Sequence, residues 1–198
     1  HDISVSGDCL RVAFTSSATN LGLKKASKLA WRSASVSGSS GGHRQVYVHV
    51  RNGKKLDKAF KGMTFMASAS DKNRPGNGDS FEPSFARAGK AVVFSSTANN
   101  LDRGDSNGTV DVYERTFTRY YAHIKGKGVQ SLKMDTRLVS ASGGRAGNGA
   151  SQHATVTDDG RYVAYETMAS SLLAGDGNGV SDIARADMKK KRPKQEWV

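Results

Sequence analysis

The chain has 198 residues, of which 24% are charged and 36% hydrophobic, and its formal net charge is +12. This length suffices for a sizeable core, and the single cysteine, Cys9, excludes an internal disulfide and a zinc cluster built on thiolates. No segment is apolar over the roughly 20 residues that a membrane-spanning helix needs.

The first unit, residues 1–70, predicts four short strands. Apolar and β-branched residues alternate there with polar ones, and Gly, Asn, Asp and Ser bound each stretch. The strands are expected at 3–6, 10–16, 44–50 and 63–69, with an insertion over 22–43. Cys9 stands where the later units have glycine in a tight turn, so we expect that turn to be built differently here.

The second and third units follow the same plan. Residues 71–142 predict strands at 82–86, 91–96, 110–116 and 136–142, with a basic insertion over 117–135. Residues 143–188 predict strands at 153–157, 162–167 and 181–187, and no clear fourth strand. The unit is therefore expected to be incomplete, with residues 189–198 as a basic tail.

Internal repetition ties these units together. Residues 74–94 reappear as residues 145–165 at a constant offset of 71, and the register continues through the loops that follow. Residues 3–21 form a more divergent third copy, in which Phe14 aligns with Phe94. Repetition of this kind predicts like units that stack, because no unit can bury its apolar face alone.

The repeated motif runs as Gly-Lys/Arg-x-Val-x-Phe-x-Ser-x-Ala-x-Asn-Leu, followed by Gly-Asp-x-Asn-Gly-x-x-Asp-Val-Tyr in its clearest copy. It resembles the TolB-like, WD-repeat-like propeller repeats of bacterial proteins. The resemblance implies an all-β fold, a β-propeller of four-stranded antiparallel blades. About three blades are present, as a partial propeller or half of a ring, and an antiparallel sandwich is the alternative. The resemblance also implies an extracytoplasmic location, periplasmic or secreted.

Two loops carry oxygen-bearing side chains at the spacing of a calcium loop. The positions are Asp105, Asn107, Thr109 and Asp111 in the second unit, and Asp176, Asn178, Val180 and Asp182 in the third. Calcium prefers such all-oxygen surroundings, but the closing glutamate of an EF-hand is missing. The spacing predicts a weak calcium site, with a purely conformational role in the turn as the alternative. We expect the two loops to behave alike.

The positive charge gathers in the insertions and the tail. The residues expected to contact a polyanion are Lys125, Lys127, Lys189, Lys190, Lys191, Arg192 and Lys194. A solvated basic rim is the alternative. Tyr120 and Tyr121, next to the basic insertion tip, suit stacking on bases or sugars, or packing on their own sheet.

These features favour a non-catalytic β-propeller scaffold that binds a protein or a polyanion, as part of a larger propeller or assembly. The expected partner is another protein, or a second copy that completes the ring. The alternative function is a propeller hydrolase or lyase acting on a polysaccharide. His153 with Asp158 and Asp159 offers a general acid–base group, but turn chemistry explains the two carboxylates, and we assign no catalytic residue.

Overall fold

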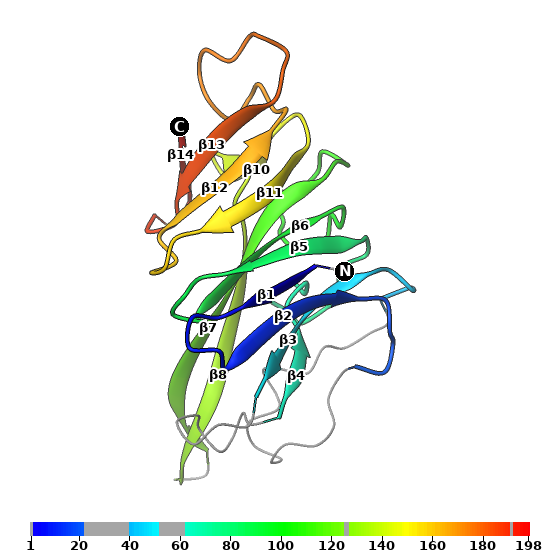
Figure 1. Cartoon of the computed structure of the whole chain (residues 1–198), viewed down its shortest axis with the longest axis vertical. Helices are drawn as coiled ribbons and strands as arrows, with labels where there is room; N and C mark the ends of the chain where they lie inside the picture. Colours follow the sequence, from blue (N-terminus) through cyan, green and yellow to red (C-terminus); the bar gives the residue numbers. More distant parts are fainter. Residues whose placement is uncertain (1, 22–39, 52–61, 125–126, 191) are drawn as a thin grey trace.

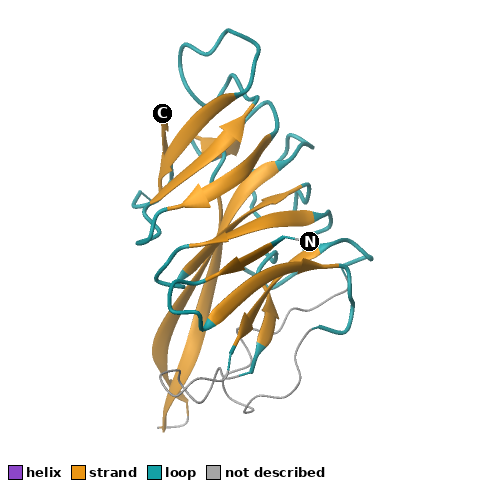
Figure 2. Ribbon diagram, viewed as in Figure 1, coloured by secondary structure: helices purple, strands orange, loops and turns teal. Residues whose placement is uncertain are grey.

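A computed structural model of the chain describes residues 2–21, 40–51, 62–124, 127–190 and 192–198, with side chains omitted over 119–132. The described chain is all-β, as expected, and contains no helix that could span a membrane. It forms three four-stranded antiparallel sheets and one two-stranded sheet. The three larger sheets follow one another along the long axis of the molecule, in chain order (Figures 1 and 2).

The first sheet contains β1 (Ile3–Val5), β2 (Arg11–Ser16), β3 (Gln45–Val50) and β4 (Thr64–Met66), paired in that order. All four expected strands are confirmed, although the fourth is shorter than the sequence predicts. Most of the predicted insertion, residues 22–39, lies outside the described residues.

The turn between β1 and β2 corrects one expectation. Cys9 adopts a φ of 53°, in the same left-handed region as Gly89 (64°) and Gly160 (77°) at the equivalent positions. The turn is therefore built in the same way as in the other units, and Cys9 carries the steric cost that glycine avoids. Asp8 supports this turn by accepting a hydrogen bond from the Leu10 backbone N–H at 3.0 Å.

The second sheet contains β5 (Ser80–Phe85), β6 (Ala91–Ser96), β7 (Asp111–Ile124) and β8 (Lys127–Leu138). The basic insertion is a continuation of the last two strands, which pair from Tyr113–Leu138 out to Ile124–Lys127. The long hairpin passes the first sheet (Figure 1), where Phe117 meets Phe65 edge-on with ring centroids 5.2 Å apart. A small hairpin of β9 (Ala141–Ser142) and β10 (Arg145–Ala146) leads to the third sheet.

The third sheet contains β11 (Ser151–Val156), β12 (Tyr162–Thr167), β13 (Asp182–Asp187) and β14 (Lys194–Trp197). The expectation of an incomplete third unit is wrong, since β14 pairs with β13 inside the predicted tail. Gln195 explains this strand. Its Nε2 donates to the carbonyls of Val139 (2.8 Å) and Ala141 (2.9 Å), and its Oε1 accepts from the Tyr165 hydroxyl at 2.7 Å.

Apolar side chains hold the sheets face to face. One cluster joins the first and second sheets and includes Val48, Phe65, Val92, Phe94 and Tyr113. A second cluster joins the second and third sheets and includes Val93, Val112, Val163, Tyr165 and Ala184. Burial of these faces supplies the main stabilisation, and each sheet depends on its neighbour for it.

The segments that connect consecutive sheets require glycine at matching places. A Cβ on Gly78 would lie 2.7 Å from the Thr97 carbonyl carbon, and one on Gly149 would lie 2.6 Å from the Met168 carbonyl oxygen. These glycines let each connection pass against the backbone that follows the second strand of its sheet.

Candidate functional site

The loop between β6 and β7 holds the predicted calcium residues of the second sheet. Asp105 is 7% exposed and accepts a short hydrogen bond from the Tyr113 hydroxyl through Oδ2. Asp111, the first residue of β7, is fully buried and accepts from the Ser140 Oγ at 2.6 Å through Oδ1. Asn107 bridges the loop to the next connection, because its Nδ2 donates to the Gly147 carbonyl at 2.8 Å.

Three oxygens of this loop have no hydrogen-bond partner although they are buried. They are Asp105 Oδ1, Thr109 Oγ1 and Asp111 Oδ2. A buried polar atom without a partner costs free energy, on the order of 1–3 kcal/mol for a neutral group and more for a charged one. An ordered water or a cation would satisfy each of these three oxygens.

The electrostatics of the loop agree with its burial. Burial raises the pKa of Asp111 to about 7, and the nearby Asp105 carboxylate acts in the same direction, while the side chains of Ser140 and Asn107 oppose the shift. Burial also raises the pKa of the Tyr113 phenol, as does its hydrogen bond to Asp105. The Tyr113 hydroxyl therefore stays a donor to Asp105 over the whole physiological range.

The equivalent loop of the third sheet is different, so the expectation that the two loops behave alike is not supported by their geometry. Asn178 is exposed, Val180 is 56% exposed and provides no side-chain oxygen, and Asp176 is only half-buried. Asp182 has one buried oxygen without a partner, Oδ2, and its Oδ1 accepts from Asn178 Nδ2 at 3.4 Å. Ala184 stands where the second sheet has Tyr113, so no phenol reaches into this loop.

Neither loop gathers many ionisable ligands. Within the described residues, no group of three or more His, Cys, Asp or Glu side chains is placed to hold a metal ion. Any cation in the loop of the second sheet would need hydroxyl, carbonyl or water oxygens beside the two carboxylates, which is an ordinary combination for calcium.

A second polar constellation, which sequence reasoning missed, follows the first strands of the three sheets. Glu82 and His153 occupy equivalent bulges, with φ values of 54° and 55°. The Glu82 N–H donates to Asp2 Oδ2 at 3.0 Å, and the His153 N–H donates to Glu82 Oε2 at 3.1 Å. Each carboxylate thus caps the bulge of the next sheet. The constant offset between Glu82 and His153 was the signal that could have revealed this row.

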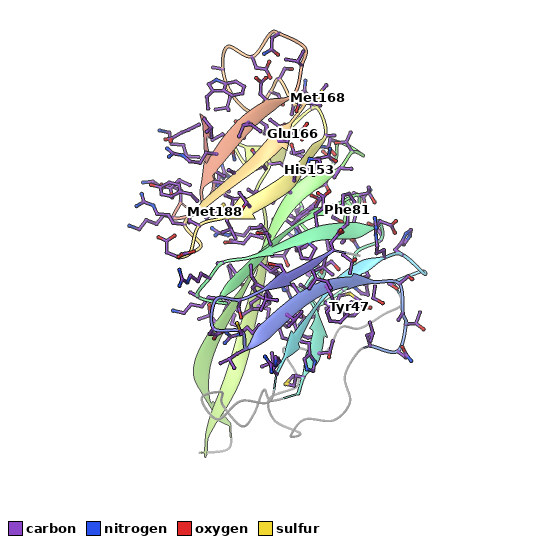
Figure 3. The ribbon with its side chains drawn as sticks, in the orientation of Figure 1. Tyr47, Phe81, His153, Glu166, Met168 and Met188 are labelled. Carbon is purple, nitrogen blue, oxygen red and sulfur yellow. The ribbon has the colours of Figure 1, made fainter. Side chains whose placement is uncertain are left out.

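The His153 imidazole completes that row. Its Nδ1 lies 2.8 Å from Glu166 Oε2 and its Nε2 lies 3.2 Å from Glu82 Oε1, and Figure 3 shows His153 beside Glu166 on the third sheet. The hydrogen bond with Glu166 raises the pKa of His153, and the Glu82 and Glu166 charges add to this shift. The structure thus pairs His153 with glutamates rather than with Asp158 and Asp159, which lie in the following turn.

Of the residues predicted to bind a polyanion, the structure describes four with their side chains, and all four lie in the segment that follows β13. Lys191 and Lys125 lie outside the described residues, as does the side chain of Lys127. Lys189, Lys190 and Arg192 are exposed beside the third sheet, while Lys194 belongs to β14 and pairs with Glu196 at 3.3 Å. Polyanion binding stays a prediction, as does stacking by Tyr120 and Tyr121.

An open cleft of about 520 Å³ lies where the connection between the first two sheets meets the loop after β6. Several of its polar groups hold backbone turns. Asp71 accepts from the Thr136 N–H at 2.5 Å, and Asn100 donates to the Pro75 carbonyl at 2.8 Å. The alternative of a polysaccharide hydrolase or lyase stays a prediction.

No protein-family model matches this chain, and no curated protein matches it either. The resemblance to TolB-like repeats remains a prediction that rests on the repeated motif.

Proposed function

We propose that the chain is a non-catalytic β-propeller scaffold in which the three larger sheets are blades. Its role is to bind a protein partner that supplies a further four-stranded sheet. One observation carries this proposal: the first sheet has an apolar outer face that is equivalent, residue for residue, to faces buried between sheets elsewhere in the chain.

Strand pairing defines this outer face. Ile3 lies opposite Phe14, which lies opposite Tyr47, and Tyr47 lies opposite Met66. Ile3 is 66% exposed and Phe14 is half-buried. The next row adds Val5 and Val12, of which Val5 is 50% exposed. Exposed apolar side chains gathered on one face mark an interaction surface.

The same positions are covered in the other two sheets. Val92, Phe94 and Tyr113 of the second sheet are fully buried against the first sheet. Val163 and Tyr165 of the third sheet are buried to at least 99% against the second. The repeat therefore uses this face to receive a neighbouring sheet. In the first sheet the face stays exposed at Ile3 and Val5 and half-buried at Phe14, whereas Tyr47 and Met66 are buried.

The opposite end of the stack has a different character. The outer face of the third sheet carries the ion pairs Arg161–Asp187 (3.2 Å) and Arg185–Glu196. The two guanidinium groups also lie over the Tyr162 ring, 4.6 and 4.8 Å from its centroid. A polar outer face is typical of the capping unit of a repeat array.

This contrast favours one occupant. A second copy of the chain would have to present the charged face of its third sheet to the apolar face of the first sheet, and desolvation of those charges is costly. A sheet with small apolar residues fits better. The face that the second sheet presents to the third is an example, with Ala91, Val93 and Val112. The proposed partner is therefore a further sheet of the same repeat type.

The test adds such a sheet. A second copy of residues 80–151 is fused directly before His1, so that Ser151 of the copy precedes His1 in the register that the repeat uses. We expect the thermal midpoint to rise by about 5 °C or more, since burial of two or three apolar side chains contributes a few kcal/mol. Separate unfolding of the added copy, with the original midpoint unchanged, would contradict the proposal.

Two lysine variants show which face of the chain causes the rise in the thermal midpoint. Phe14→Lys should abolish the gain in the fused chain, whereas Ile183→Lys, at the 48% exposed position on the third sheet, should preserve it. Sedimentation of the unfused chain adds a further outcome. A dimer that Phe14→Lys dissociates would assign the face to a second copy instead.

A further inference from the structure

The first residue of the third strand differs between the first two sheets. Gln45 in the first sheet and Asp111 in the second both pair with the last serine of the preceding strand, Ser16 or Ser96. Both also accept a hydrogen bond at 2.6 Å from an equivalent serine, Ser68 or Ser140. The two side chains therefore occupy matching places.

The second polar atom of each side chain shows the difference. The Nε2 of Gln45 donates to the carbonyls of Gly76 and Gly78, both at 3.1 Å, in the connection to the next sheet. The corresponding connection in the second unit contains Gly147 and Gly149. Here Asn107 Nδ2, and not the residue equivalent to Gln45, donates to the Gly147 carbonyl at 2.8 Å. The Asp111 carboxylate cannot donate, and its Oδ2 is buried without a hydrogen-bond partner. A cation can satisfy that oxygen.

Two neighbouring side chains also have a buried oxygen without a hydrogen-bond partner. Asp105 Oδ1 and Thr109 Oγ1 are buried without a hydrogen-bond partner, as Asp111 Oδ2 is. Asp105 and Asp111 are both more than nine-tenths buried, so bulk water does not solvate these oxygens. Asn107 fixes the loop from both sides, since its Oδ1 accepts from the Thr109 N–H at 2.9 Å and its Nδ2 donates to Gly147.

We propose that the loop of the second sheet binds one calcium ion through Asp105 Oδ1, Thr109 Oγ1 and Asp111 Oδ2. Backbone carbonyls and water complete the shell of six to eight oxygens that calcium takes. Two carboxylates, a hydroxyl and irregular backbone suit calcium better than magnesium, which demands near-ideal octahedral geometry. The loop of the third sheet is not such a site, because Val180 lacks the hydroxyl and the loop is largely exposed.

The bound ion strengthens the junction between the second and third sheets. Asp111 begins β7, Ser140 lies just after β8, and Gly147 lies in the connection that leads to β11. The ion fixes the loop against the start of β7, and the hydrogen bonds of Asp111 with Ser140 and of Asn107 with Gly147 link that site to the other two segments. Occupancy of the loop therefore stabilises the folded chain.

The experiment measures thermal unfolding of the full chain, first with EDTA and then at rising free Ca²⁺. We expect the midpoint to rise by about 5–10 °C at a free concentration 100 times Kd. Asp111→Asn should remove this rise, whereas Asp182→Asn, the matched substitution in the third sheet, should leave it intact. Mg²⁺ at equal concentration should produce a smaller rise.

A second variant and a second readout guard against a failure of Asp111→Asn to fold. Thr109→Val removes one ligand at a half-buried position and should weaken calcium binding at least tenfold. Tb³⁺ in the place of calcium should show luminescence sensitised by Tyr113, which Tyr113→Phe reduces. The proposal is overturned if about 10 mM Ca²⁺, well above the Kd of weak extracellular sites, leaves the wild-type midpoint unchanged. It is equally overturned if the rise survives in Thr109→Val and disappears in Asp182→Asn.

Discussion

Phe14 and Tyr47 in the first sheet form the same stacked pair as Phe94 and Tyr113 in the second, with ring centroids 5.9 Å apart in both. The interplanar angles, 25° and 20°, are also similar. The pairs differ in what covers them. Phe94 and Tyr113 are fully buried under the first sheet, whereas Phe14 is half-buried and Tyr47 is buried with its hydroxyl donating to the Ala18 carbonyl. The repeat therefore fixes the arrangement of this face, and the neighbouring sheet completes the burial of its phenylalanine.

Truncating the two phenylalanines gives the largest expected difference. Phe94→Ala should lower the free energy of unfolding by about 3–5 kcal/mol, because it leaves a cavity between two sheets. Phe14→Ala should lower it by about 1 kcal/mol, since much of its surface is already in contact with solvent. Urea unfolding measures both values, and equal losses would show that the outer face of the first sheet is as well packed as the face between the sheets.

Arg115 lies at the covered face of the second sheet. This guanidinium is fully buried between the first two sheets, where it donates to the carbonyls of Ala69 (2.9 Å) and Ser70 (3.2 Å) and to Asn73 Oδ1 (2.9 Å). Arg115→Met should cost about 3 kcal/mol, because it leaves buried carbonyls without a donor. The control is Arg87→Met, whose exposed pair with Asp158 should contribute less than about 0.5 kcal/mol. A cost for Arg115→Met as small as that of the control would show that the junction does not depend on this donor.

His153 gives the smallest expected effect, at the exposed row that connects the bulges. Its hydrogen bond with Glu166 raises its pKa in the folded state, with Glu82 contributing from the neighbouring sheet. The stabilisation is therefore fully present below the unfolded pKa of about 6.5 and is lost as pH rises through the folded pKa. NMR titration of the imidazole should give a midpoint above 6.5, and His153→Gln should remove the corresponding decrease in thermal midpoint. A midpoint at or below 6.5 would mean that the two glutamates do not hold the ring in solution.

Most of the strands could be predicted from the sequence, because their apolar alternation and their turn residues repeat at a fixed offset. The sequence did not predict β14, because the lysines before it dominate the local composition. The strand is held by Gln195, whose side chain donates to the carbonyls of Val139 and Ala141. Such a contact between segments far apart in sequence leaves no local pattern. The same holds for Cys9, whose side chain gives no sign that the surrounding turn imposes a positive φ.

The candidate site was only partly predictable. The spacing of Asp105, Asn107, Thr109 and Asp111 indicated a calcium loop, but it could not distinguish this loop from its copy at 176–182. Burial makes that distinction, and burial depends on Tyr113 and on the segment around Ser140 that closes over the loop. The equivalence of Gln45 with Asp111 was also hidden, because the insertion in the first unit shifts its register relative to the other two.

Hydrogen exchange of the amides in β1 and β2 tests most directly whether the outer face of the first sheet receives a further sheet. Exchange is compared in the original chain and in the chain with a copy of residues 80–151 fused before His1. We predict that the added copy slows exchange in β1 and β2 by roughly tenfold or more, with little change in β12 and β13. Unchanged exchange in β1 and β2, with the added copy folded, would contradict the account.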